Sequence, residues 1–424
     1  MLDLKAIRED PEAARAALSR RGPEAAEALD ELLRLDARRR ELLPEIEEGK
    51  ARQNKASEVI AEAKRSGGDA EGQIAEMREL APRIKQLEAE LGEVEEKRDQ
   101  LAAQVPNLPD PDAPDGMTED DAMELRRVGE RPEFGFEPRD HLEIGASLGL
   151  IEMEAAARAS GSRFAYLMGD LVLVELALVR YALDLLRGEG HEPVVPPVLV
   201  REEPMFGTGF LPGDRDQIYE VERDELYLVG TSEVSLAALH ADQILEPGSL
   251  PLRYAGFSTC FRREAGAAGK DTHGIFRVHQ FDKVEMFSFV EPAASGEEHE
   301  RLLAIEERIL SALEIPYRVV NIAAGDLGTP AAKKYDCEAW IPSQGRYREL
   351  TSCSNTTDYQ ARRLDCRYRP AEGESPSHVH TLNGTAVAVG RTLIALIENR
   401  QEEGHAFSLP EVLHTYGAPK RIEP

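Results

Sequence analysis

The stretch "FRREAGAAGKDTHGIFRVHQFDK", residues 261–283, gathers five lysine and arginine side chains in one short segment of an acidic chain. Residues 254–264, "YAGFSTCFRRE", and residues 275–290, "IFRVHQFDKVEMFSFV", alternate as strands do, and glycines between them indicate a long loop. Two antiparallel strands joined by such a loop would place Arg262 and Arg277 together on one face of a sheet. The segment therefore predicts a β-hairpin that presents positive charge.

A phosphate-bearing ligand is one explanation of this charge. Guanidinium groups bind phosphate oxygens in a forked geometry, and Phe281 offers a flat face on which a base can stack. A hairpin with surface salt bridges to Glu264 and Asp282 explains the residues equally well. The segment by itself leaves both readings open.

Composition limits the classes of protein to consider. The 424 residues predict two domains, or one large domain with an appendage, and a formal charge of −28 disfavours nonspecific binding to nucleic acid or to an anionic membrane. Long apolar runs and a secretion signal are not evident, so we expect a cytoplasmic protein with no membrane partner. The four cysteines show no CxxC spacing, which argues against zinc and disulfides.

The N-terminal quarter has the pattern of a helical hairpin. Apolar positions repeat at heptad spacing over residues 28–63 and again over residues 77–105, and "RSGGD" at 65–69 supplies a turn. These features predict an antiparallel coiled-coil arm, which Pro44 and Pro82 should bend locally.

An oligomerisation or spacing element is the simpler role for such an arm. Basic residues favour a nucleic-acid contact only slightly, because acidic residues are abundant as well. They lie on the first helix and near the tip: Arg38, Arg39, Arg40, Lys50, Arg52, Lys55, Lys64 and Arg65.

A linker rich in proline and aspartate, "VPNLPDPDAPDG", follows the arm, and we place the domain boundary there, giving domains 1–108 and 109–424. Beyond it, short β-branched runs and helical stretches follow one another without a strict βαβ order. The pattern favours an α+β domain on an antiparallel or mixed sheet. Neither GxGxxG nor GxxxxGK[ST] is present, so a Rossmann or P-loop site is not supported.

With the whole chain in view, residues 261–283 resemble motif 2 of class II aminoacyl-tRNA synthetases, specifically the bacterial seryl-tRNA synthetase family. "GHEPVVPPVLV" is similar to motif 1, with Pro197 as its proline, and "NGTAVAVGRTLIALIENRQ" is similar to motif 3. "YLVGTSEVSL" and "YRELTSCSNTTDYQARR" resemble the family's substrate and metal-binding segments. The helical arm is also the family's arrangement.

The resemblance implies a class II antiparallel-sheet catalytic domain that attaches L-serine to tRNA-Ser through a seryl-adenylate. It implies ATP as a substrate, Mg²⁺, a homodimer formed through motif 1, and a tRNA held by the arm. It also leaves tRNA-Sec open as a second substrate.

The family's residue roles carry over to matching positions. Catalytic roles fall on Arg262, Glu264, Arg277 and Arg391, and Mg²⁺ would be held by Glu349 and Ser352. The serine site would comprise Thr231, Ser232, Glu233, Glu285, Asn383 and Thr385. ATP would be bound by Arg262, Arg263, Glu264, Arg277, Val278, Phe281, Glu349, Leu350, Thr351, Ser352 and Arg391.

Some positions depart from the family pattern. Gly230 and Ser235 stand where proline is frequent, and Ala386 stands where many bacterial members have glycine. A paralogue that resists a serine-adenylate mimic, a relative that loads a carrier protein and a noncatalytic scaffold remain alternatives. The family's long arm disfavours the second, and the intact motif residues disfavour the third. Lys270, in the loop, is expected to meet the tRNA acceptor end.

Overall fold

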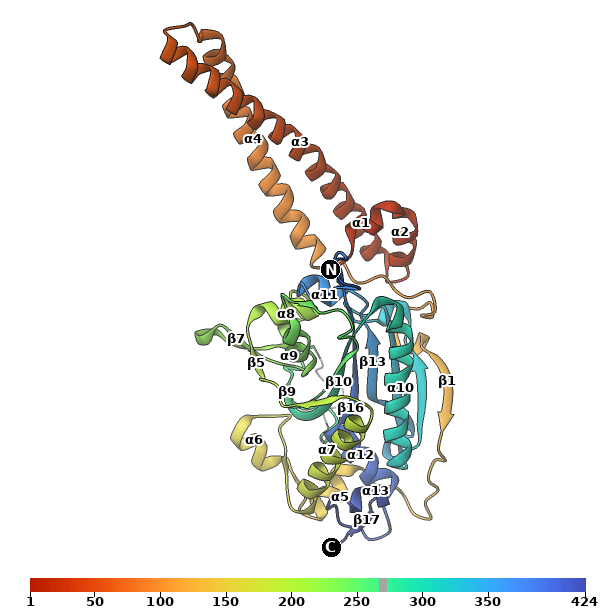
Figure 1. Ribbon diagram of the computed structural model, residues 1–424. Helices are drawn as coiled ribbons and strands as arrows, with labels where there is room; N and C mark the ends of the chain where they lie inside the picture. Colours follow the sequence, from red (N-terminus) through yellow and green to blue (C-terminus); the bar gives the residue numbers. More distant parts are fainter. Residues whose placement is uncertain (267–272) are drawn as a thin grey trace. The chain divides into compact units, whose positions relative to one another are not determined.

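The computed structural model describes residues 1–266 and 273–424 (Figure 1). The chain divides into two compact units, Leu2–Val105 and, together with Met1, Pro106–Pro424. Lys270 lies outside the described residues. No helix in the described ranges is long and apolar enough to cross a bilayer.

The first unit is built around two long helices, α3 (Pro23–Ser66) and α4 (Glu71–Ala102), which follow the short helices α1 (Leu4–Glu9) and α2 (Pro11–Ser19). The two long helices pack against each other in an antiparallel hairpin (Figure 1). Heptad positions fill the seam, with a buried cluster of Leu42, Ile46 and Leu87. The predicted coiled-coil hairpin is confirmed, and both helices continue through their internal prolines.

The second unit is built on an eight-stranded sheet with the order β1-β11-β12-β13-β16-β10-β9-β4. All neighbouring strands are antiparallel except β4 and β9. The predicted α+β domain on a mostly antiparallel sheet is therefore confirmed. The strands are β1 (Met123–Val128), β4 (Glu192–Val194), β9 (Leu252–Phe261), β10 (Gln280–Val290), β11 (Tyr317–Asn321), β12 (Lys333–Ile341), β13 (Arg346–Asn355) and β16 (His380–Ala388).

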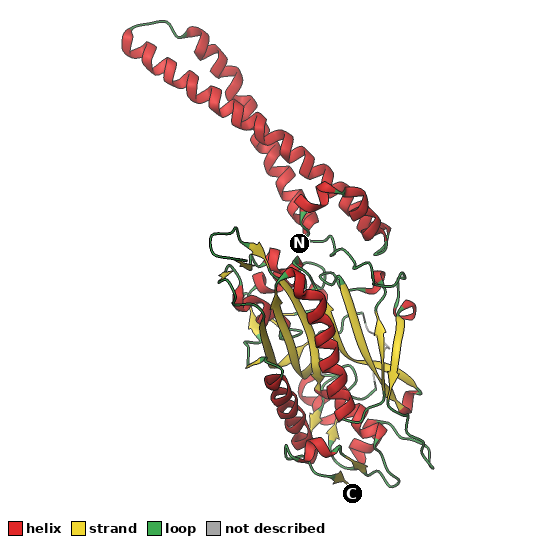
Figure 2. Ribbon diagram, turned by 45° about the vertical axis from the view of Figure 1, so that its right-hand side comes forward, coloured by secondary structure: helices red, strands yellow, loops and turns green. Residues whose placement is uncertain are grey.

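Three helices supply most of the core on one face of this sheet: α7 (Asp170–Gly188), α10 (Ser295–Ala312) and α12 (Val389–Asn399). Helix α10 packs on β13 and β16, while α7 packs on β9 and β10. Figure 2 shows a long helix lying along the strands of the sheet. Val284 and Met286 of β10 are fully buried in this core. Because side chains alternate along a strand, Lys283 and Glu285 must face the other way.

Shorter elements surround the sheet. The helices are α5 (His141–Ser147), α6 (Glu154–Ser160), α8 (Glu202–Thr208), α9 (Glu233–Ala237), α11 (Tyr359–Arg363) and α13 (Glu411–His414). Small sheets pair β2 (Ile151–Glu152) with β3 (Tyr166–Leu167), and β17 (Phe407–Ser408) with β18 (Arg421–Ile422). Two others join β5 (Leu199–Val200), β6 (Tyr219–Val221) and β7 (Leu226–Leu228), and β8 (Ile244–Leu245), β14 (Arg367–Tyr368) and β15 (Ser377–His378).

The segment that resembles motif 1 is divided in the structure. Residues 191–200 form β4 and β5 with a break between them. The break contains Pro196 and Pro197, which have no amide hydrogen to donate to a neighbouring strand.

The hairpin has little room at Gly49. A Cβ atom there would lie 2.9 Å from Cγ1 of Ile84 on the facing helix, whereas a Cβ at Gly92 would have no described atom within 4 Å. We expect Gly49→Leu to lower the arm's melting temperature, and Gly92→Leu to raise it, because leucine is the better helix former. Circular dichroism at about 222 nm during heating measures both. An equal shift for the two variants would contradict the tight seam.

Candidate active site

Two adjoining pockets open beside the strands that carry the sequence motifs. The basic pocket is lined by Arg262, Glu264, Ile275, Phe276, Arg277, Val278, Phe281, Lys283, Glu349, Leu350, Thr385, Ala388, Gly390 and Arg391. The carboxylate pocket is lined by residues that include Asp214, Thr231, Glu233, Arg262, Lys283, Glu285, Lys334, Glu349, Ser352, Asn383 and Thr385. Among the described residues, four line both pockets: Arg262, Lys283, Glu349 and Thr385.

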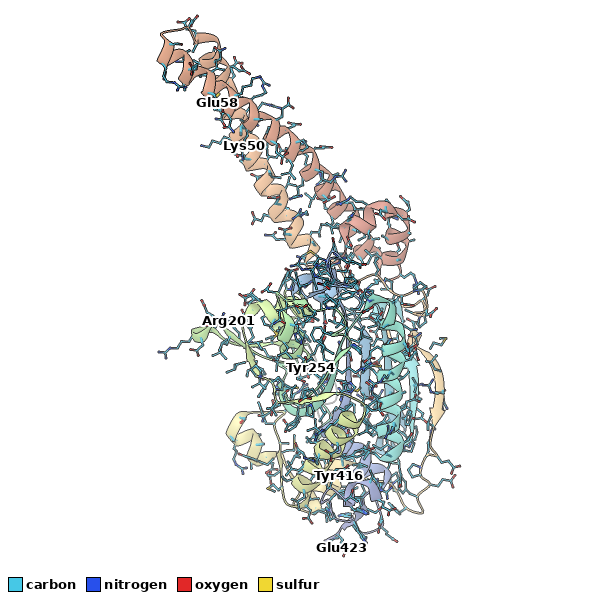
Figure 3. All side chains as sticks on the ribbon, viewed as in Figure 1. Lys50, Glu58, Arg201, Tyr254, Tyr416 and Glu423 are labelled. Atoms are coloured by element: carbon cyan, nitrogen blue, oxygen red, sulfur yellow. The ribbon has the colours of Figure 1, made fainter. Side chains whose placement is uncertain are left out.

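Strand alternation explains how β10 serves both pockets. Phe281, Lys283 and Glu285 are two residues apart, so they share the face turned away from the core. Figure 3 draws the side chains on the ribbon and labels Tyr254, which marks the neighbouring strand β9. Glu285 lies directly opposite Thr385 of β16 in the strand register.

The hairpin strands are shorter than the sequence suggested. Strand β9 ends at Phe261 and β10 begins at Gln280, so Arg262, Glu264 and Arg277 follow or precede the strands. The backbone N–H of Arg262 donates to the carbonyl of His279 at 3.0 Å, which holds the mouth of the hairpin together.

The arginines of the basic pocket are fixed by contacts within the protein. Nε of Arg262 donates to the carbonyl of Gly230 at 3.2 Å, and its guanidinium lies 5.4 Å from the centre of the Phe281 ring. Nη1 of Arg277 donates to Oε2 of Glu264 at 2.5 Å. The pocket thus presents oriented positive groups beside an aromatic face.

Arg391 of α12 forms the opposite wall. Its Nη1 donates to the carbonyl of Glu349 at 2.9 Å and lies 3.4 Å from Oε1 of the same residue, while its guanidinium stacks 4.8 Å from the centre of the Phe276 ring. Partial desolvation in the pocket favours the neutral form of Glu349, whose side chain is 48% exposed, but the charges of Arg391 and Lys334 outweigh it and hold the pKa of this carboxyl well below its ordinary value. Glu349 is therefore an anion at neutral pH.

A β-bulge brings Glu349 and Ser352 to the same side of β13. Residues three apart would face opposite ways in a regular strand, but the register with β12 shifts so that Leu350 has no partner of its own. Glu349 and Ser352 consequently line the same pocket. Thr351 faces the core instead, where its hydroxyl donates to Oε2 of Glu306 at 2.9 Å.

Lys283 links two walls of the carboxylate pocket. Its Nζ donates to Oγ1 of Thr231 at 2.8 Å and is in close ion-pair contact with Glu285. Oγ1 of Thr385 lies 3.5 Å from Oε2 of Glu285. Both charged side chains are almost fully buried, so their pairing offsets a large cost of desolvation.

Glu233 occupies a different electrostatic setting. Nε2 of Gln360 and Nδ2 of Asn383 both donate to its Oε1, at 2.8 and 2.9 Å. Burial, reinforced by the charge of Glu285, raises the pKa of Glu233 to about 7. The carboxyl is therefore poised to ionise when a cation enters the pocket.

Some predicted residues lie outside the two pockets. Ser232 is fully buried, with its side chain close to Gly256 of β9. Arg263 lies with its guanidinium 5.9 Å from the centre of the Tyr219 ring. Neither side chain is among the residues that line the pockets.

Sequence reasoning assigned no role to Lys283, Gln360 or Lys334. The signal for Lys283 was present, because it lies at two-residue spacing between Phe281 and Glu285. Gln360 and Lys334 reach the site from other elements through tertiary packing, and no local pattern in the sequence indicated them.

Comparisons with known proteins agree along the whole chain. A model of the seryl-tRNA synthetase N-terminal domain matches residues 1–109, and a model of the tRNA synthetase class II core domain (G, H, P, S and T) matches residues 218–400. A serine–tRNA ligase of Rubrobacter xylanophilus is 55% identical over 76% of each chain. A serine–tRNA ligase of Thermobifida fusca is 48% identical over 100% of this chain and 99% of its own.

A solved structure gives the same result. The crystal structure of seryl-tRNA synthetase from Pyrococcus horikoshii complexed with ATP covers 100% of both chains with a TM-score of 0.94 and 43% identity. Sequence and fold therefore agree over both units, and this chain belongs to the seryl-tRNA synthetase family of class II aminoacyl-tRNA synthetases.

Proposed function

We propose that the basic pocket binds ATP and that the carboxylate pocket binds L-serine, in the ATP-dependent attachment of serine to tRNA that family membership gives this chain. The observation that carries the assignment is the set of four residues that line both pockets. The first step joins a phosphate to a carboxylate, so the two ligands must meet at a shared boundary. Arg262 and Lys283 supply positive charge there.

In the basic pocket, Arg262 would contact the α-phosphate, where negative charge builds up in the transition state. Arg277 and Arg391 would engage the outer phosphates. Phe281 would stack on the adenine ring, and Glu264 and Val278 would contact its edge. Leu350 would pack against the nucleotide as part of β13, while Thr351 and Arg263 would act through their backbones, since their side chains point elsewhere.

In the carboxylate pocket, Glu233 would pair with the ammonium group of serine, because Asn383 and Gln360 occupy only one of its oxygens in the described part of the chain. Glu285 and Thr385 would contact the serine hydroxyl, and Thr231 lines the same wall. Alanine would leave these buried groups without a partner, which gives a reason for selectivity.

A magnesium ion fits the oxygens of Glu349 and Ser352. The bulge turns both side chains into one pocket, and the low pKa of Glu349 keeps its carboxylate charged, as a hard cation requires. When bound, the ion would neutralise phosphate charge.

The reaction needs no covalent bond to the protein. A carboxylate oxygen of serine attacks the α-phosphorus, the bond from that phosphorus to pyrophosphate breaks, and seryl-adenylate forms. A terminal ribose hydroxyl of tRNA then attacks the seryl carbonyl, and AMP leaves. The side chains act by orienting both ligands and by balancing charge as it moves.

The arm would bind tRNA-Ser. Most basic residues of helix α3 are engaged with glutamates, including Arg38 with Glu90 and Arg52 with Glu76. Within residues 1–266 and 273–424, no ion pair is found for three of them: Arg40, Lys55 and Lys64. Their charges are available for phosphates, which suits recognition of an RNA backbone.

We also propose a cytoplasmic homodimer. Val172, Leu173 and Leu176 of α7 are 37%, 47% and 57% exposed, and Val195 beyond β4 is 83% exposed. An apolar surface of this kind, on α7 and in the motif 1 segment that follows it, is suited to a second copy of the chain. Cytoplasmic location follows from the proposed substrate, tRNA.

We expect Glu285→Ala to lower kcat/KM for serine at least about a hundredfold in ATP–pyrophosphate exchange, because Lys283 is left unpaired and the serine hydroxyl loses its acceptor. Glu291→Ala, at an exposed position directly after β10, is the control and should behave as the parent chain does. Near-normal exchange by Glu285→Ala would overturn the serine assignment. Parallel assays with threonine, alanine and cysteine test selectivity.

The raised pKa of Glu233 predicts a pH effect on serine binding. Below about pH 7 the carboxyl is protonated, and ionising it to meet the ammonium group costs free energy. The KM for serine should therefore rise as pH falls, by about tenfold per unit well below 7, and level off above it. Glu233→Gln should raise the KM for serine and remove this slope. A slope that persists in Glu233→Gln would assign the titration to another group.

The arm prediction separates the two steps of the reaction. Replacing Arg40, Lys55 and Lys64 together with alanine should raise the KM for tRNA-Ser about tenfold or more and leave pyrophosphate exchange unchanged. Lys50→Ala with Arg52→Ala is the control, since Glu88 and Glu76 already balance those charges.

Deleting residues 30–100 should likewise spare pyrophosphate exchange and abolish most charging of tRNA-Ser. Equal loss of both activities would indicate a purely structural arm. The same assay with tRNA-Sec tests that substrate.

A further inference from the structure

A buried histidine outside both pockets connects two segments that line the basic pocket. His141 is the first residue of α5 and is 4% exposed. Its ring lies between Glu398, near the end of α12, and residues 274–275, which return the motif 2 hairpin to β10. No sequence motif pointed to this residue.

The contacts of the imidazole define which of its ring nitrogens carries the hydrogen. Nδ1 lies 2.9 Å from Oε1 of Glu398, and the backbone N–H of Ile275 donates to Nε2 at 3.2 Å. Because the Ile275 N–H can only donate, Nε2 must accept, and the ring hydrogen must be on Nδ1, where it points to Glu398. A second bond, from the backbone N–H of His141 to the same Glu398 oxygen at 3.1 Å, fixes the start of α5.

Glu398 is itself held firmly in place. It is fully buried, and its other oxygen accepts from the backbone N–H of Ser343 at 3.1 Å. The same helix carries Arg391, which forms one wall of the basic pocket. The histidine is thus anchored to the helix of motif 3.

The other end of the connection leads directly into the pocket. Ile275 is the first of four successive lining residues, which continue through Phe276 and Arg277 to Val278. Within this run, Phe276 lies against Arg391 of α12. A hydrogen bond to the Ile275 N–H therefore sets where the run begins relative to α12.

Gly274 shows how closely the backbone approaches the ring. Its φ is +70°, and a Cβ atom there would lie 2.0 Å from Nε2 of His141. No side chain fits at this distance without displacing the imidazole or the backbone. Glycine at 274 and histidine at 141 thus form one matched contact.

We propose that His141 is a positioning residue for ATP: its neutral imidazole joins α12 to the start of residues 275–278 and so sets the spacing of the two walls of the basic pocket. The proposal rests on the assignment of ATP to that pocket. His141 does not touch the ligand and acts through Ile275 and Glu398.

Two conservative variants separate the two contacts. Asparagine places an amide nitrogen near the position of Nδ1, so His141→Asn keeps a donor to Glu398 and loses the acceptor for Ile275. Glutamine places an amide oxygen near the position of Nε2, so His141→Gln keeps an acceptor for Ile275 and loses the donor to Glu398. In pyrophosphate exchange, we expect His141→Asn to raise the KM for ATP about tenfold with the KM for serine unchanged. His141→Gln should stay within about threefold of the parent KM for ATP.

Glycine variants test the same contact from the other side and do not depend on the folding of a histidine variant. Gly274→Ala should raise the KM for ATP as His141→Asn does, because its Cβ would displace the ring. Gly266→Ala is a matched control on the other side of the loop: its φ is +78°, but a Cβ there would meet no atom of the described residues within 4 Å. It carries the same backbone strain without the collision, and its KM for ATP should change less than about twofold.

The outcomes distinguish this proposal from the assignment of ATP. If Phe281→Ala raises the KM for ATP while His141→Asn and Gly274→Ala leave it unchanged, the positioning role is wrong and the ATP site stands. If Phe281→Ala has no effect on the KM for ATP, the site assignment itself fails. Equal rises in the KM for ATP and for serine, or a lower melting temperature with both KM values unchanged, would show that His141 serves only stability.

Discussion

The alternation of side chains along the central strands β10, β13 and β16 is the constraint on which the rest of the structure depends. In β10, Val284 and Met286 lie in the core beneath the helices, and the residues between them face the pockets. Each strand therefore serves the core and the site with neighbouring residues. A shift of one residue in the pairing of β10 would exchange the two sets and turn Lys283 and Glu285 into the apolar core.

Charge is balanced within the site rather than by solvent. Arg277 lies against Glu264, Arg391 against Glu349 and Lys283 against Glu285, so these three cations already have a carboxylate partner. Arg262 is held instead by the carbonyl of Gly230. These contacts hold the cations in place in a chain with a formal charge of −28, so a ligand that enters needs little reorganisation of the site.

The sequence predicted those parts of the structure that follow a local rule. Alternation around residues 261–283 indicated a hairpin, and heptad spacing indicated the arm, because both patterns depend on neighbours in the chain. It did not predict the ends of β9 and β10, which depend on where the hairpin mouth closes. Nor did it indicate Gln360 or His141, which reach their partners from distant segments through packing alone.

The bulge at Leu350 has a consequence for how this chain can change over evolutionary time. Glu349 and Ser352 share a side of β13 only because one residue between them has no partner on β12. Regular pairing of β13 with β12 at unchanged length would turn one of the two oxygens into the hydrophobic interior. Deletion of one residue between them, together with loss of the bulge, would instead leave them two residues apart on the same side. The length of this interval and the bulge can therefore change only together over evolutionary time.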